Sequence, residues 1–262
     1  MSAAALTPGA PGMIDISGSA KVPFSRLVRV ELRKMADTRA GFWLLVSIGL
    51  ITAAILVIFL LVAPDDQKTF LNFMGATATP QGFVLPVLGI LLVTSEWGQR
   101  TALTTFALEP SRPRVIGAKI LAAILIGLAA IVVAIVLAAV ATVIGGQDNA
   151  WEHIGIDDFA KFGLLQISGI LQGLAFGLLL LNSAAAIVLY FVLPIAFNII
   201  ATLWTRMQDI APWIDLGTSQ PPLYSGVNMT GEEWAQLATS SAIWILLPLA
   251  VGLWRVMRAE VK

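Results

Sequence analysis

Six long stretches without a charged residue constrain this chain more than any other feature of its sequence. They cover residues 42–63, 75–95, 120–144, 162–181, 184–204 and 238–254. A helix of about 20 apolar residues crosses the roughly 30 Å hydrocarbon layer of a membrane, and a charge at the centre of such a helix costs roughly 2.5–3.5 kcal/mol. The pattern predicts an all-α, polytopic membrane protein whose six transmembrane helices lie within 42–254. Pro80 and Pro86 interrupt the second stretch, where we expect a kinked helix.

The composition excludes several classes of protein. Hydrophobic residues make up 58% of the chain and charged residues 12%, whereas a soluble domain has about 25% charged residues. A soluble enzyme, a disordered chain and a nucleic-acid-binding protein are therefore excluded. The chain has no cysteine and one histidine, His153, so we expect no thiolate or poly-histidine metal site. It also lacks the glycine-rich loop that binds nucleotide phosphates.

The charged residues divide unequally between the two sides of the predicted membrane domain, although the formal net charge is zero. With the N-terminus in the cytoplasm, thirteen of the 16 basic residues fall in cytoplasmic segments and ten of the 16 acidic residues fall in external ones. Cytoplasmic segments of membrane proteins carry an excess of Lys and Arg. We therefore expect both termini in the cytoplasm, as a flexible tail at 1–20 and a short tail at 255–262.

The segment 21–41 has the pattern of an amphipathic helix, because most of its apolar residues share one arc of about 140° on a helical projection. These apolar residues are Phe24, Leu27, Val28, Leu32 and Met35, and the basic residues opposite them are Arg26, Arg29, Arg33 and Lys34. Glu31 is an exception, since it places a carboxylate on the apolar side. The pattern predicts a helix lying in the cytoplasmic interface against anionic lipid. The alternative is a helical flank that only follows the positive-inside rule.

The predicted cytoplasmic segment 96–118 is too long for a simple connection between two spans. Residues 96–108 can form a short helix, which Pro110 and Pro113 should end. A short helix between two spans is suited to docking on a soluble partner. The alternative is a solvated loop without a partner.

The predicted external segment 205–237 contains several prolines and then a helix-start signal. Thr230 and Glu233 have the spacing of a capping box, in which each side chain bonds the backbone N–H of the other. We therefore expect a helix that begins near Gly231 and runs into the sixth span.

The fourth and fifth spans contain small and uncharged polar residues. Gly169, Gly173 and Gly177 recur at every fourth position, a spacing that lets two helix backbones approach closely. Packing within the chain and packing between subunits are both open. The uncharged polar residues include Gln166, Gln172, Asn198 and Thr202, which either form hydrogen bonds between helices or line a substrate path. No predicted span carries an ionisable group, which weakens the case for a proton-coupled carrier.

The chain resembles the permease subunit of an ABC-2-type (type V) ABC exporter, especially the Ala/Val-rich permeases of actinobacteria. The similarity covers most of the chain: the segment RVELRKMADTRAGFW at 29–43, the six spans, and EWGQRTALTTFALEPSRPRVIGAK at 96–119. Glu96, Thr101 and Pro110 match the family's motif after the second span, whereas Arg100 stands where many relatives have Gly. The resemblance implies that 96–110 forms the helix that couples to an ATPase and that 21–41 forms the connecting helix.

The resemblance further implies a non-catalytic transport subunit in a bacterial plasma membrane. It would pair with a second copy or a paralogue and with two copies of a separate ABC ATPase, which would bind ATP and Mg²⁺; this chain itself would hold no cofactor. The residues expected to contact or transmit force from the ATPase are Glu96, Arg100, Thr101, Phe106, Glu109, Pro110 and Arg112. Because the spans are uncharged, we expect a hydrophobic or amphiphilic cargo. An integral-membrane enzyme or assembly factor and a secondary carrier are the alternatives.

Overall fold

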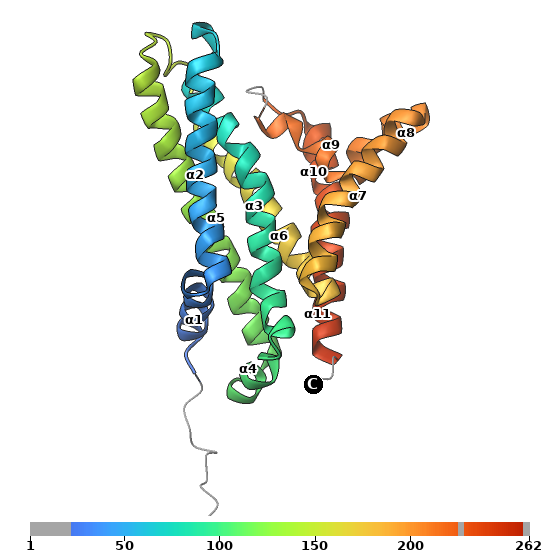
Figure 1. Cartoon of the computed structure of the whole chain (residues 1–262). Helices are drawn as coiled ribbons and strands as arrows, with labels where there is room; N and C mark the ends of the chain where they lie inside the picture. The colour runs from blue at the N-terminus through green and yellow to red at the C-terminus, as the bar shows by residue number, and fades with distance from the viewer. Residues whose placement is uncertain (1–21, 225–227, 259–262) are drawn as a thin grey trace, which may run out of the picture.

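The computed structural model describes residues 22–224 and 228–258, and every regular element among them is helical (Figure 1). Six helices in these ranges are long and apolar enough to cross a membrane. They are α2 (Arg39–Val62), α3 (Phe70–Gly98), α5 (Arg112–Gly145), α6 (Ile156–Leu180), α7 (Ser183–Leu203) and the continuous helical segment Gly231–Arg258. The predicted all-α fold with six helices of spanning length is confirmed.

Shorter helices connect or precede these six. They are α1 (Phe24–Asp37), η1 (Asp65–Gln67), α4 (Ala102–Leu108), α8 (Thr205–Ile214), α9 (Leu216–Ser219) and η2 (Pro221–Tyr224). α1, α4 and the end of α11 (Leu247–Arg258) lie at one end of the bundle, whereas α8, α9 and α10 (Gly231–Ser241) lie toward the other (Figure 1). We call the first of these the α1/α4 end.

α1 is the amphipathic helix that the sequence predicts. Val28 and Met35 on its apolar side are buried. Thr38 separates α1 from α2 and caps α2 by accepting a hydrogen bond from Gly41 N at 3.2 Å. The turn is so tight that a Cβ on Gly41 would overlap the carbonyl group of Met35. Glycine at this position therefore allows the tight turn between α1 and α2.

α3 and α6 form the centre of the bundle, and the glycines of α6 face α3 of the same chain. A Cβ on Gly173 would overlap the backbone of Pro86, and one on Gly177 would lie 3.0 Å from the carbonyl oxygen of Ile90. Gly169 lies against the ring of Pro86. Because lipid provides no hydrophobic drive for helix association, this close backbone approach is a main source of packing energy in a membrane. The glycine stripe therefore packs within the chain.

The helices extend beyond the uncharged stretches, and one expected element is wrong. Residues 96–108 do not form a single short helix, because α3 continues through Glu96 to Gly98. Arg100 then adopts a left-handed conformation with φ 57°, and α4 begins at Ala102. Backbone hydrogen bonds continue a helix past the point where its side chains become charged, so a hydropathy boundary does not mark a helix end. α4 does end before Pro110, as predicted.

The capping box at Thr230 is confirmed. The Thr230 side chain accepts from Glu233 N at 3.2 Å, and the Glu233 carboxylate accepts from Thr230 N at 2.7 Å. α10 begins at Gly231 and continues through a π-helical turn, η3 (Ala242–Leu246), into α11. α11 ends at Arg258, so the first half of the tail expected at 255–262 is helical. The tail expected at 1–20 and residues 259–262 lie outside the described residues.

Candidate functional site

Glu96, in the last turn of α3, joins four helices at the α1/α4 end. Its Oε1 accepts from Lys34 Nζ of α1 at 2.5 Å and lies 3.1 Å from Lys119 Nζ of α5. It also accepts from Thr105 Oγ1 of α4 at 3.3 Å. The Glu96 side chain is 7% exposed. One buried carboxylate therefore holds α1, α4 and α5 against the end of α3.

Glu31 completes this arrangement and explains why a carboxylate stands on the apolar side of α1. Its Oε2 lies 2.7 Å from Lys119 Nζ and its Oε1 lies 2.8 Å from Lys34 Nζ. Lys119 also donates to the Leu92 carbonyl of α3 at 3.0 Å. We call Glu31, Lys34, Glu96 and Lys119 the charge cluster. Two carboxylates and two ammonium groups alternate in it, so each buried charge has opposite charges within ion-pair distance.

The carboxylates of the charge cluster change the pKa of Lys34. Partial burial lowers that pKa, but the carboxylates of Glu31 and Glu96 outweigh the burial and raise it above its usual value of 10.5. Lys34 therefore stays protonated at neutral pH and contributes a full positive charge to the cluster.

Arg112 fastens α4 and α5 to the end of α11. Its Nη1 donates to the carbonyl oxygens of Val256 at 2.6 Å and Met257 at 3.3 Å. The last carbonyl groups of a helix lack partners within the helix, so this arginine satisfies two of them. The guanidinium carbon also lies 5.1 Å from the ring centroid of Phe106 in α4. Arg112, expected from the sequence to couple to an ATPase, contacts α4 and α11 of its own chain.

An ion pair between Glu109 and Arg114 connects the end of α4 to the start of α5. Arg114 Nη1 donates to Glu109 Oε2 at 2.9 Å, and Arg114 Nη2 donates to the carbonyl of Val22 before α1. Pro110 is exposed beside this pair. The α4 segment is thus attached on both sides, by the charge cluster and by the Glu109–Arg114 pair.

The structure divides the other residues of the predicted coupling and connecting segments. Arg100 and Thr101 are exposed in the turn between α3 and α4. Arg26, Arg29 and Arg33 are exposed on α1, whereas Lys34 points into the charge cluster. A groove of about 840 Å³ runs between α1, α4 and the ends of α3 and α5, and Glu31, Lys34 and Glu96 line it.

The predicted substrate-path residues lie in different places in the structure. Gln166 and Gln172 of α6 line a cavity of about 520 Å³ between α3, α6, α7 and η2. Asn198 is exposed on α7, and Thr202 lines a separate, smaller cavity beside α8. Of the four, only the two glutamines share a cavity.

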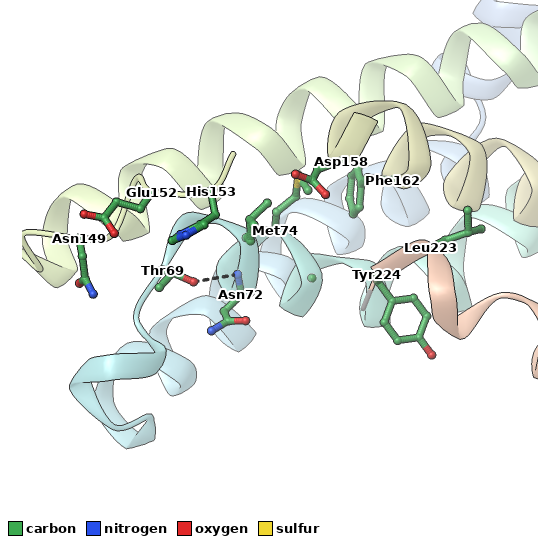
Figure 2. Close-up of a pocket in the computed structure, with 12 residues that line it drawn as sticks. Thr69, Asn72, Met74, Asn149, Glu152, His153, Asp158, Phe162, Leu223 and Tyr224 are labelled. Carbon is green, nitrogen blue, oxygen red and sulfur yellow. Dashed lines mark hydrogen bonds between the residues drawn. The ribbon is translucent and has the colours of Figure 1, made fainter. Parts of the chain in front are cut away.

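A further cavity of about 310 Å³ lies at the N-terminal ends of α3 and α6. Figure 2 shows Glu152 and His153, from the loop before α6, on one side of it and Tyr224 of η2 on another. The described part of the chain contains no group of three His, Cys, Asp or Glu side chains that could hold a metal ion.

Sequence reasoning missed two members of the charge cluster. Lys119 counts in the sequence only as one of many basic residues near a span, and Glu31 only as an irregularity in an amphipathic pattern. That irregularity was the available signal, because a carboxylate on a buried helix face requires a cationic partner. The identity of the partner depends on which helix packs there.

Neither protein-family models nor curated proteins give a match to this chain.

Proposed function

We propose that this chain is the membrane-spanning permease subunit of an ATP-driven ABC exporter. It would work in a bacterial plasma membrane with two copies of a separate ABC ATPase, which would bind ATP and Mg²⁺, and with a second copy of itself or a paralogue. The observation that carries the proposal is the position of Glu96. A single carboxylate that joins α1, α3, α4 and α5 can pass a displacement of α4 to the spanning helices.

α4 has the surface that docking on a soluble partner requires. Two leucines of this seven-residue helix are exposed: Leu103 is 53% exposed and Leu108 is 77% exposed. Phe106 is turned the other way and packs against the bundle beside Arg112. An ATPase that binds the exposed leucines would therefore push on a helix that is attached to the bundle through Thr105, Phe106 and Glu109.

α1 supports the proposal as a lipid-facing strut. Its exposed arginines Arg26, Arg29 and Arg33 would contact anionic headgroups on the cytoplasmic surface. Lys34, on the same helix, pairs with Glu96. In this arrangement α1 and α4 are both attached to the end of α3, so a push on α4 would be passed to α3 and α1 together.

The experiment is co-purification of the full-length chain with an ABC ATPase, followed by reconstitution into vesicles. We expect Leu108→Glu to lower retention of the ATPase, because it places a charge in the apolar contact. Gln67→Glu adds the same charge to an exposed residue at the opposite end and should have no effect. We expect Glu96→Gln to keep the ATPase bound but to reduce transport per ATP hydrolysed.

Two outcomes contradict the proposal. Transport that continues in ATP-depleted vesicles indicates a secondary carrier. A chain that turns over a membrane substrate chemically, without any nucleotide-binding subunit, is an integral-membrane enzyme.

A further inference from the structure

The cavity between α3, α6, α7 and η2 has an unusual lining for the interior of a membrane protein. Four glutamines line it, namely Gln81, Gln166, Gln172 and Gln220. We call it the glutamine cavity. Its remaining walls come from small, aliphatic and aromatic residues, including Leu85, Phe83 and Tyr190, and none of the described residues that line it is charged. Its volume of about 520 Å³ falls in the range of small-molecule sites, which is roughly 300–1,000 Å³.

Hydrogen bonds within the chain fix the orientation of three of these amides. Gln81 is fully buried, and its Nε2 donates to the carbonyl of Ala130 at 3.0 Å. Gln166 Nε2 donates in turn to Gln81 Oε1. Gln220 Nε2 donates to Ser168 Oγ at 3.0 Å. These bonds hold the three side chains in place at the cavity wall.

Gln172 differs from the other three. It is 7% exposed, it lines the cavity, and it makes no hydrogen bond to any residue in the described ranges. Its amide atoms are not among the buried atoms without a partner, so they remain accessible from the cavity. A ligand in the cavity that supplies both a donor and an acceptor could therefore pair with this amide.

These properties restrict the chemistry of the ligand. Amide groups donate and accept hydrogen bonds equally well, so they suit hydroxyl and amide groups. A charged ligand would lose its hydration without meeting an opposite charge. The apolar and aromatic walls suit hydrocarbon or rings.

The glutamine cavity adjoins a second cavity at the end of the bundle. It shares Gly75 and Tyr224 with the cavity drawn in Figure 2. That second cavity lies at the N-terminal end of α3, where Glu152 and Asp158 line it. Charged groups thus line the cavity at the end of the bundle, and only uncharged groups line the glutamine cavity.

We propose that the glutamine cavity binds an uncharged amphiphile that carries amide or hydroxyl groups, and that Gln172 is its main hydrogen-bonding partner. The proposal rests on the proposed function in one respect, since it takes this ligand to be the transported cargo. Binding itself requires neither ATP nor a partner chain, so the two can be tested separately.

The test measures equilibrium binding of a radiolabelled dipeptide, Phe-Leu with an acetylated N-terminus and an amidated C-terminus, to the full-length chain in lipid nanodiscs. We expect saturable binding. The same dipeptide with a free C-terminal carboxylate should bind at least about tenfold more weakly, because the cavity offers no cation.

Two variants locate the site. Gln172→Leu keeps a similar volume but removes the amide, and we expect about three- to tenfold weaker binding from the loss of one or two hydrogen bonds. Gly82→Leu fills the cavity from a position where an added Cβ meets no atom within 4 Å, so it should block binding without disturbing the fold. Gln236→Leu removes an amide from α10, outside the cavity, and should bind like the original chain.

The outcomes separate the two proposals. Equal binding by the original chain, Gln172→Leu and Gly82→Leu overturns the cavity proposal, and so does the absence of saturable binding or equal affinity for the carboxylate form. Any of these results leaves the ATPase test unaffected. Conversely, binding of the neutral dipeptide through Gln172 by a chain that associates with no ATPase supports the cavity proposal and contradicts the proposed function.

Discussion

Replacing Lys119 by methionine should destabilise the protein more than any single change at its surface. Lys119 is 2% exposed, and its ammonium group lies 2.7 Å from Glu31 and 3.1 Å from Glu96. Methionine keeps the length of the side chain but not its charge. Glu31 and Glu96 then share the single cation of Lys34, which is itself partly exposed.

The magnitude follows from burial. Removing one partner of a buried ion pair costs about 3–5 kcal/mol, because the remaining charge stays out of water without compensation. Lys68→Met is the matched control. Its ammonium group pairs with Asp65 at 2.7 Å, but the Asp65 side chain is 74% exposed. Surface pairs of this kind contribute about 0–1 kcal/mol.

The assay is reversible unfolding in mixed detergent micelles with increasing SDS, followed by the loss of helical circular dichroism. A double variant, Glu31→Gln with Lys119→Met, closes the cycle. Because it removes a carboxylate together with the cation, it should be less destabilised than the sum of the single variants, by about 0.5–3 kcal/mol. The reasoning is refuted if Lys119→Met costs no more than Lys68→Met, or if the two changes at the cluster are additive.

Two further predictions follow from the packing and the charges. Gly173→Ala should lower the free energy of unfolding by about 1–3 kcal/mol, because the added methyl overlaps the backbone of Pro86; Gly75→Ala, where the methyl meets no atom within 4 Å, should be neutral or stabilising, and equal effects of the two would contradict the close packing. Because the pKa of Lys34 is raised above 10.5 in the folded protein, its contribution to stability is complete below that pH and is lost as pH rises through the folded-state value. The stability difference between the original chain and Lys34→Gln should therefore shrink above pH 10.5, and a difference that stays constant up to the highest pH at which the chain refolds would contradict the pairing.

The elements that could be predicted from sequence depend on neighbouring residues. The spans follow from uninterrupted apolar runs, α1 from the periodicity of residues 24–35, and the start of α10 from the spacing of Thr230 and Glu233. Each of these signals is complete within one or a few helical turns. A membrane strengthens them, since a spanning segment must satisfy its own backbone hydrogen bonds.

The site was less predictable, and Arg112 shows why. The family resemblance implies that Arg112 couples to an ATPase, which stays a prediction, but no local pattern indicates that its guanidinium also binds carbonyl groups of α11, some 144 residues later. Gln172 and Asn198 likewise read as equivalent polar residues in neighbouring spans. Only the packing of α6 against α3 places Gln172 beside a cavity and leaves Asn198 exposed.

Sequence alone therefore determined that this is a helical chain with six helices long and apolar enough to span a membrane, because hydrophobicity acts locally and a membrane leaves few alternatives. The sequence also showed that Glu31 places a carboxylate on the apolar side of an amphipathic helix, where it requires a cationic partner. Only the tertiary structure decided which cations pair with that carboxylate. Only the tertiary structure also decided whether Glu96 belongs to a short helix or to the end of a long one. Ion pairing and cavity formation depend on how helices distant in sequence approach one another; the glycines of α6 set the approach of α6 to α3, beside which the glutamine cavity lies.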